Sequence, residues 1–222
     1  MPRFRAAAAH PRGPAGHAVA ARELTRAVRH LGRHDPILRP LMRRSGPCGL
    51  RPNRHYFPTL LRSIVGQQLS GTAADTIWGR VRARFPESRY PRPEAVLATR
   101  DEDLRALGLS RAKVAAVKDL SAHVLDGRLD LHHLSRLTDE QVVEALVAVR
   151  GIGEWTAHMF MMFSLFRLDV LPTGDLGIRK GFQTLYGLPA LPTPDEMRAI
   201  AEARGWAPYR SVACWYLWRL FD

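Results

Sequence analysis

The sequence predicts an all-α protein, and three observations lead to that expectation. From about Ala18 onward, apolar residues recur at the spacing of amphipathic helices. No stretch alternates apolar and polar residues as a half-buried strand does. Proline-rich points interrupt the helical pattern, at residues 51–53, 90–93 and 188–194. A chain of 222 residues is long enough to bury a core in one domain or in two small lobes.

The expected helices lie between these breaks and the turns that glycines mark. They span residues 18–32, 35–44, 57–68, 72–85, 101–107, 110–126, 138–149, 154–166, 176–187, 194–203 and 208–221. One of them begins with a capping box, because Gln141 stands three residues after Thr138. The segment that precedes the first helix, residues 1–17, is rich in Ala, Arg, Pro and Gly, and we expect a disordered or extended tail there.

A tight Gly151-Ile152-Gly153 turn joins two of the expected helices. The glycines supply the backbone freedom and the close approach that a sharp reversal needs. The second helix begins at Glu154, and its first turn exposes backbone N–H groups at the positive end of the helix dipole. A phosphate oxygen can bind there. An ordinary connection between helices has the same Gly-x-Gly pattern, so the turn alone leaves both interpretations open.

A single carboxylate, Asp175, follows the turn at Leu171–Gly174 and stands at the start of the next expected helix. Aspartate is a favoured N-cap residue, so it can simply cap that helix. Thr173 and Gly174 can also bend the chain so that the carboxylate faces a cleft, and one residue can fill both roles.

The composition indicates an acidic polymer as partner, because the net charge is +12. The first 54 residues hold 12 of the arginines and only two acidic residues, so the charge is concentrated there. Only Cys48 and Cys214 occur, which excludes a four-cysteine iron–sulfur cluster and a disulfide framework. The sequence contains no apolar run of membrane-spanning length, and we expect a reducing, cytoplasmic, nucleoid-associated location.

Five motifs follow one another along the chain: residues 63–70 (SIVGQQLS), 107–113 (LGLSRAK), 151–157 (GIGEWTA), 171–180 (LPTGDLGIRK) and 206–218 (WAPYRSVACWYLW). In this order they resemble the helix-hairpin-helix DNA glycosylase superfamily, and most closely its 3-methyladenine DNA glycosylase II (AlkA-type) branch. The likeness covers roughly residues 55 to 221. It implies a two-lobed all-α fold, without the N-terminal β-sheet domain of longer relatives. The implied division places residues 18–55 with 190–222 in one lobe and 56–189 in a hairpin lobe, with the active cleft between them.

By this resemblance Asp175 is the catalytic residue of a monofunctional DNA glycosylase that releases alkylated bases, such as 3-methyladenine and 7-methylguanine, and leaves an abasic site. Cleavage of an N-glycosidic bond builds positive charge on the sugar. A carboxylate can stabilise that charge or activate water, and the sequence does not decide between these roles. Bifunctional relatives carry a lysine where this chain has Trp155, so no amine is available there to form a Schiff base.

The resemblance also assigns the other site residues. Trp218 matches the base-stacking tryptophan, and we expect the pocket to include Trp155, Met159, Leu176 and Tyr56. The residues expected to contact DNA are Gly151, Ile152, Gly153, Glu154, Thr156, Gln67, Gln68, Leu69 and Arg210. Gln68 aligns best with the wedge that fills the space left by a flipped base, with Leu69 next, although the same turn could equally be an ordinary connection between helices. For Trp206, Tyr209 and Trp215 we expect core packing instead.

No cofactor is implied for catalysis, although the backbone carbonyls of Val147, Val149 and Ile152 can hold Na⁺ or K⁺ as the hairpin does in relatives. The expected partner is double-stranded DNA with alkylated bases, bound by a monomer. Two alternatives stay open at this point. One is a non-catalytic helix-hairpin-helix module, in which Asp175 is only a cap. The other is a glycosylase of the same fold for another lesion.

Overall fold

The computed structural model describes residues 14–222, with side chains described from residue 18 onward. All regular structure in this range is helical, which confirms the predicted all-α class. The expected tail falls mainly on residues 1–13, which lie outside the described residues, whereas its last four residues begin the first helix at Pro14. The described chain forms two compact units. We call residues 54–160 unit 1, and residues 14–53 with 161–222 unit 2.

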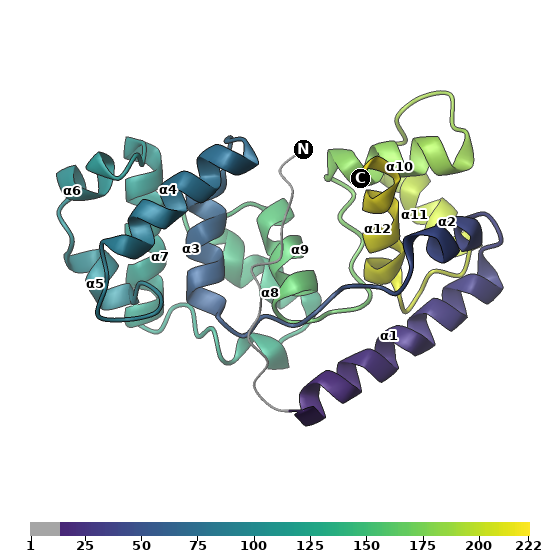
Figure 1. Cartoon of the computed structure of the whole chain (residues 1–222), viewed down its shortest axis with the longest axis horizontal. Coiled ribbons are helices and arrows are strands. Elements are labelled where there is room, and N and C mark those ends of the chain that lie inside the picture. The colour runs from purple at the N-terminus through teal and green to yellow at the C-terminus, as the bar shows by residue number, and fades with distance from the viewer. Residues whose placement is uncertain (1–13) are drawn as a thin grey trace. The chain divides into compact units, whose positions relative to one another are not determined.

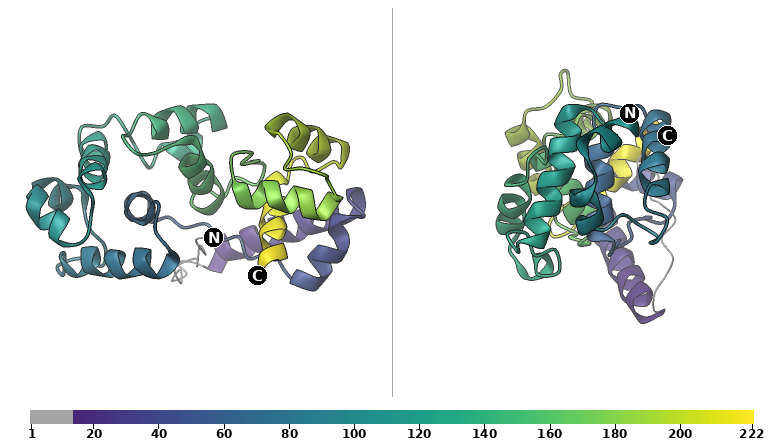
Figure 2. Two further views of the ribbon diagram at one scale, coloured as in Figure 1. Left: turned by 90° about the horizontal axis from the view of Figure 1, so that it is seen from above. Right: turned by 90° about the vertical axis from the view of Figure 1, so that its left-hand side faces the viewer.

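Unit 1 is built around one buried helix, α3 (Tyr56–Gly66), which packs against α4 (Gly71–Ala83) and α7 (Arg111–Leu125). In the left view of Figure 2, α3 is seen end-on with the other helices of unit 1 around it. Its apolar face is almost wholly buried, at Leu60, Leu61, Ile64 and Val65. The remaining elements are α5 (Pro93–Ala98), α6 (Asp101–Ala106), the 3-10 turn η1 (Leu134–Arg136), α8 (Asp139–Val147) and most of α9 (Glu154–Phe163).

Unit 2 is organised in the same way around α12 (Arg210–Trp218), which is labelled in Figure 1. It packs against α1 (Pro14–His34), α2 (Leu38–Ser45) and α10 (Leu176–Tyr186). The approach to α10 is close, since a Cβ at Gly181 would lie 2.8 Å from the Cβ of Leu217. The unit is completed by α11 (Pro194–Ala203) and the 3-10 turn η2 (Arg219–Phe221).

A buried carboxylate, Asp35, ties these helices together. One of its oxygens accepts hydrogen bonds from the N–H groups of Ile37 and Leu38, at 3.0 and 2.9 Å. The other accepts from the Tyr186 hydroxyl at 2.6 Å and from Nε1 of Trp206 at 2.8 Å. Burial raises the pKa of the Tyr186 hydroxyl, and the hydrogen bond to Asp35 raises it further. The complete burial of Trp206 confirms that this residue belongs to the core.

Every expected helix is present, with ends that differ by a few residues. Two short elements, α5 and η1, were missed. The three residues of η1 are too few to show a helical period, and α5 begins at Pro93, inside the proline-rich break at residues 90–93. The second hairpin helix was predicted to run to Phe166 but ends at Phe163. Phe166 has a left-handed φ of 59° instead, and Arg167 donates its N–H to the carbonyl of Met161. Residues 161–189 belong to unit 2, whereas the sequence-based division assigned them to the hairpin lobe.

Candidate functional site

Asp175 is the N-cap of α10, as the simpler of the two interpretations expected. The turn before it is closed by two backbone hydrogen bonds, from Thr173 N–H to the Leu171 carbonyl and from Asp175 N–H to the Pro172 carbonyl. With φ −77° and ψ 117°, Asp175 directs Oδ1 to the N–H of Ile178 at 2.8 Å. The cap therefore fixes the orientation of a carboxylate that is only half-buried.

A second donor reaches the same carboxylate from another part of the chain. Nε1 of Trp218, the last residue of α12, donates to Oδ1 of Asp175 at 3.1 Å. The Trp218 ring stacks on Phe163, with ring centres 5.8 Å apart and planes 26° apart. Leu176 follows Asp175 and is half exposed. Unit 2 thus brings together a carboxylate, an aromatic pair and an apolar side chain, and of these only Phe163 was not assigned to the site from the sequence.

The other expected pocket residues belong to unit 1. Tyr56 begins α3, and its ring meets Phe160 edge-on, with ring centres 5.4 Å apart. Met159 is almost completely buried in α9, whereas Trp155 and Tyr56 are half-buried. Of the five predicted pocket residues, three therefore belong to unit 1 and two, Leu176 and Trp218, to unit 2.

The hairpin turn, residues 148–153, joins α8 to α9. The predicted capping box of α8 is present, since Gln141 and Thr138 bond to each other's backbone N–H. Gly151 has a φ of +80°, and a Cβ there would lie 2.9 Å from the Cβ of Ala116, so this position requires glycine. Gly153 has no positive φ and a Cβ there would meet nothing, which corrects the expectation that both glycines are needed for backbone freedom or close approach.

The side chains of the turn contribute unequally to its surface. Ile152 and Thr156 are buried, so they can contribute to a ligand only through the main chain. Glu154 and Arg150 are exposed. The N–H of Ala157 is already bonded to the Gly153 carbonyl at 3.0 Å, so a ligand at the start of α9 would meet the N–H groups before it.

The α3–α4 turn, residues 67–70, holds the three candidate wedge residues. Nε2 of Gln67 donates to the Gly151 carbonyl at 2.7 Å, so this side chain is engaged with the hairpin turn. Gln68 is exposed and has a left-handed φ of 57°. Leu69 is half-buried, and Ser70 caps α4 by accepting from the Ala73 N–H.

Arg210, the first residue of α12, is held by a carboxylate of its own unit. Its Nε and one terminal nitrogen bond to the two oxygens of Asp169 at 2.7 and 2.8 Å, and its backbone N–H also bonds to Oδ1. This geometry is a bidentate ion pair with a structural role in unit 2.

The cysteines do not offer a nucleophile. Burial raises the pKa of Cys48 to about 12 and raises that of Cys214 well above its usual range, so both stay thiols at neutral pH. Within residues 18–222, His, Cys, Asp and Glu side chains form no group suited to a metal ion. In the same range no helix is long and apolar enough to cross a membrane.

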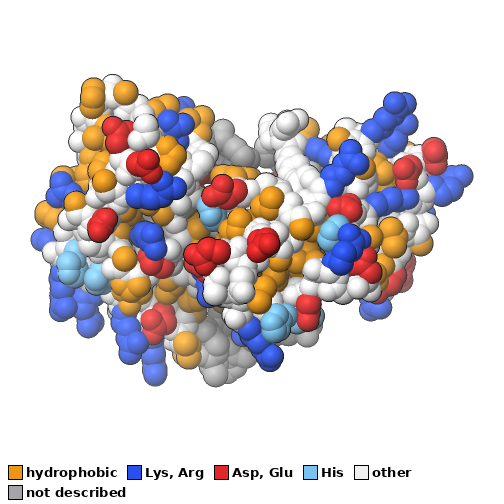
Figure 3. All heavy atoms as spheres, turned by 180° about the vertical axis from the view of Figure 1, so that it is seen from behind, with side chains coloured by type: hydrophobic (Ala, Val, Ile, Leu, Met, Phe, Trp, Pro, Cys, Tyr) orange, Lys and Arg blue, Asp and Glu red, His pale blue; other side chains and the backbone are white. Residues whose placement is uncertain are grey.

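Charge and cavities do not by themselves locate the site. On the face shown in Figure 3, basic and acidic side chains are interspersed. A hollow of about 720 Å³ lies between α1 and α2, lined by four arginines and by Val28, Met42 and Pro47, and no predicted site residue lines it.

Comparisons with known proteins agree with the motifs. A family model described as HhH-GPD superfamily base excision DNA repair protein matches residues 61–206. DNA-3-methyladenine glycosylase 1 of Schizosaccharomyces pombe is 34% identical over 202 residues, which cover 88% of this chain and 87% of the relative. A crystal structure of DNA-3-methyladenine glycosidase from Bacillus halodurans is 39% identical with a TM-score of 0.78, covering 87% of this chain and 88% of that one. S. pombe 3-methyladenine DNA glycosylase in complex with abasic DNA has a TM-score of 0.77 and 34% identity, covering 87% and 95%.

Proposed function

The chain belongs to the HhH-GPD superfamily of base excision DNA repair proteins and is a DNA glycosylase, and we propose that it releases N3- and N7-methylated purines from double-stranded DNA by hydrolysis. The observation that carries the proposal is the Asp175 carboxylate, held by the Ile178 N–H and by the indole of Trp218. Two relatives that match along most of their length are named for 3-methyladenine.

In the proposed reaction, Asp175 acts on the charge that develops as the glycosidic bond breaks. The bond between sugar and base lengthens, the base leaves with the bonding electrons, and the sugar becomes an oxocarbenium-like cation. A carboxylate already fixed in orientation stabilises this cation without reorganising at that moment. Water then adds to the sugar carbon and loses a proton, and the same carboxylate can accept it. The products are a free base and an abasic site.

We propose that the reaction stops at the abasic site. A lyase step would need an amine that forms a Schiff base with the sugar, and the chain has only three lysines, Lys113, Lys118 and Lys180. None of them lies in the hairpin turn or in α9, where Trp155 occupies the position at which bifunctional relatives carry lysine.

The preference for alkylated purines rests on the stacked Trp218 and Phe163 rings beside the carboxylate. A purine methylated at N3 or N7 carries positive charge, and an indole face attracts such a cation by about 1–2 kcal/mol when the contact is desolvated. An uncharged purine gains stacking without this electrostatic attraction. The same charge also makes the methylated base a better leaving group.

The DNA contacts follow from the two turns of unit 1. The N–H groups that open α9 can bind a phosphate, and the exposed Gln68 can fill the space that a flipped nucleotide leaves. A Na⁺ or K⁺ ion would be held by the carbonyls of Val147, Val149 and Ile152. Val147 is the last residue of α8, where helix carbonyls lack intrahelical partners, and the other two lie in the hairpin turn, where the Val149 carbonyl also accepts the Ile152 N–H at 3.1 Å. Neutral carbonyl oxygens suit a monovalent cation. We further propose that the protein acts as a monomer in the cytoplasm.

A non-catalytic DNA-binding module is the alternative that a specific observation favours, because Asp175 does cap α10. Incubating the purified protein with genomic DNA treated with a methylating agent, and identifying the released bases by chromatography, separates the two. We expect free 3-methyladenine and 7-methylguanine. DNA binding without release of any base would reject the enzymatic proposal.

A further inference from the structure

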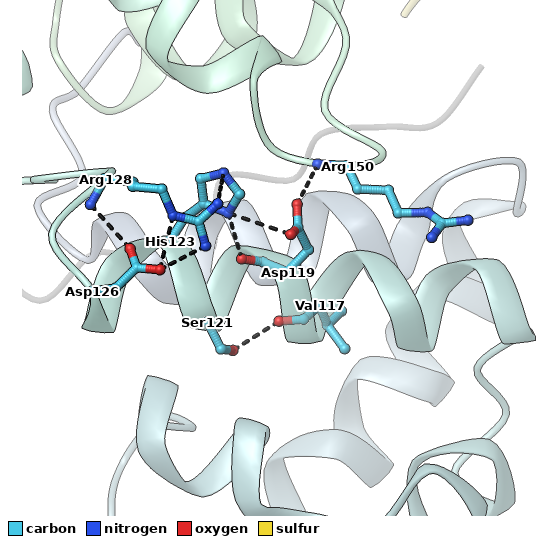
Figure 4. A network of polar contacts seen from close by, with 7 residues as sticks. All are labelled: Val117, Asp119, Ser121, His123, Asp126, Arg128 and Arg150. Atoms are coloured by element: carbon cyan, nitrogen blue, oxygen red, sulfur yellow. Dashed lines mark hydrogen bonds and ion pairs between the residues drawn. The ribbon is translucent and has the colours of Figure 1, made fainter.

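The hairpin turn is held from α7 by a side chain that sequence analysis did not single out. The Asp119 carboxylate accepts the backbone N–H of Arg150 at 2.7 Å, across 31 positions of the chain. Figure 4 shows this contact, with Asp119 rising from α7 toward the turn. The N–H that Asp119 binds lies just beyond the last turn of α8. The carboxylate therefore fixes the main chain immediately before Gly151.

Helix α7 also contacts the hairpin turn one residue further along, at Gly151. Ala116 lies three residues before Asp119, hence on the same face of α7. A Cβ added at Gly151 would lie only 2.9 Å from the Cβ of Ala116, which is closer than van der Waals contact allows. The turn is thus in van der Waals contact with α7 at Gly151 and hydrogen-bonded to it at Arg150.

A third contact connects the hairpin turn to the α3–α4 turn. Gln67 is the C-cap residue that follows α3, and its side-chain amide donates to the Gly151 carbonyl at 2.7 Å. Next to it, Nζ of Lys113 donates to the Val65 carbonyl at 2.8 Å, which joins α7 to the last turn of α3. Desolvation lowers the pKa of Lys113, as expected for an amine folded back onto the protein. Helix α3, helix α7 and the hairpin turn therefore form a closed triangle of contacts.

Asp119 lies beside a polar network formed by the end of α7 and the residues that follow it (Figure 4). Nδ1 of the buried His123 lies 2.9 Å from the Asp119 carbonyl and 3.4 Å from its carboxylate. A guanidinium nitrogen of Arg128 lies 3.1 Å from Nε2 of His123, and Arg128 also pairs with Asp126 at 2.6 Å. Arginine can only donate, so Nε2 accepts and Nδ1 carries the proton. The imidazole consequently donates to the Asp119 backbone carbonyl, and its ring lies beside the Asp119 carboxylate.

We propose that Gln67 and Asp119 are positioning residues that fix the hairpin turn in register with the α3–α4 turn, so that Gln68 rather than Gln67 is presented as the wedge. The inference rests on the proposed function, because it takes both turns as DNA contacts. The side chain of Gln67 is hydrogen-bonded to the Gly151 carbonyl, whereas Gln68 is exposed and has a left-handed backbone conformation. The spacing of the two turns is then already fixed before DNA binds. The protein therefore loses less conformational entropy on binding a duplex that contacts both turns.

The test measures affinity for a duplex that carries a tetrahydrofuran abasic analogue, which cannot be processed. Gln67→Met keeps the length and neutrality of the side chain but removes the donor, and we expect about fivefold weaker binding from the loss of one hydrogen bond. Asp119→Leu and Asp119→Asn lose the same charge, yet only Asn keeps an acceptor for the Arg150 N–H. We expect Leu to weaken binding about tenfold and Asn to recover most of that loss. Gln183→Met on α10 is the matched control, with less than a twofold effect expected.

A double variant separates positioning from independent DNA contacts. Because Gln67 and Asp119 hold the same turn, Gln67→Met with Asp119→Leu should weaken binding by less than the product of the single effects. Melting temperatures are recorded for every variant, and the Asn rescue guards against a general loss of folding. Affinity of Gln67→Met equal to wild type, strict additivity, or failure of Asn to rescue would overturn the proposal. Since binding is measured on unprocessed DNA, a wild-type protein that releases no base would reject the proposed function while leaving this test intact.

Discussion

The hairpin turn of unit 1 and the Asp175 turn of unit 2 are built in opposite ways. In the hairpin turn the main chain is the proposed functional part, and side chains from distant helices, Asp119 and Gln67, hold it. In the Asp175 turn a side chain is the proposed functional part, and it accepts hydrogen bonds from the main chain three residues later and from Trp218. The first arrangement presents backbone groups to a ligand, and the second presents one carboxylate.

The difference has a consequence for substitution. A side chain that caps its own helix can be exchanged for another capping residue without disturbing the fold. A main-chain turn that two helices hold cannot be altered locally, because its shape depends on glycine at position 151 and on what packs behind it. A substitution at Asp175 can therefore remove the catalytic charge and leave the fold intact, whereas a substitution at Gly151 changes DNA binding and stability together.

The largest effect is expected for Asp175→Asn. Asparagine is as good an N-cap as aspartate, so α10 keeps its cap and the melting temperature should change little. The negative charge is lost, and we expect base release from methylated DNA to fall by about a thousandfold or more, as for the removal of a strong transition-state interaction. Single-turnover release of 3-methyladenine measures it, with binding to the abasic-analogue duplex as control. Release by the variant at an appreciable fraction of the wild-type rate would contradict the catalytic role.

A pair of alanine substitutions tests the hairpin side of the comparison. Gly151→Ala places a Cβ 2.9 Å from Ala116 at a φ of +80°, and we expect a loss of about 2 kcal/mol in the free energy of unfolding, together with weaker DNA binding. Gly153→Ala meets no atom and needs no left-handed backbone, so its stability should change by less than about 0.5 kcal/mol. Denaturant titration of both variants gives the comparison, and equal losses would show that the two glycines are not distinguished by packing.

The same contrast explains what could be predicted from the sequence. The capping box at Thr138, the cap at Asp175 and the glycine turn are local signals, within three or four residues, and each is present in the structure. Helices with at least two turns of apolar periodicity were also found, because periodicity needs length.

Contacts between distant residues could not be predicted in this way. The Gln67 amide reaches a carbonyl 84 positions away, and Asp119 reaches an N–H 31 positions away. Neither partner is a side chain, so no residue type at position 150 or 151 signals the contact. Phe163 lies within the helix predicted over residues 154–166, and its stacking on Trp218 depends on where α12 ends. The motif resemblance supplied residue identities, whereas the supporting contacts came only from the three-dimensional structure.

An intermediate effect is expected at Trp218, a distant side chain that donates a hydrogen bond to Asp175. Trp218→Phe keeps an aromatic ring on Phe163 but removes the Nε1–H that donates to the carboxylate. We expect base release to fall about tenfold through the loss of this charge-assisted hydrogen bond. Trp218→Leu should lose more, since stacking is also removed. Parallel single-turnover rates for both variants separate the hydrogen bond from the ring, and an unchanged rate in the Phe variant would assign Trp218 to packing alone.

The smallest expected effect is on the pH dependence of the free energy of unfolding, and it concerns α9, the helix that follows the hairpin turn. His158 lies on α9 with 16% of its side chain exposed, and burial lowers its pKa below the ordinary 6.5, with Glu154 at 3.7 Å acting in the opposite direction. As the pH falls, the unfolded chain takes up this proton first, so the stability is fully present above about pH 6.5 and is lost as the pH falls through the folded pKa. We expect the wild type to lose up to about 1 kcal/mol between pH 7.5 and 5.5 that a His158→Gln variant does not lose. Denaturant titrations at the two pH values measure the difference. If the free energy of unfolding changes equally with pH in both proteins, His158 does not contribute to the loss of stability in acid.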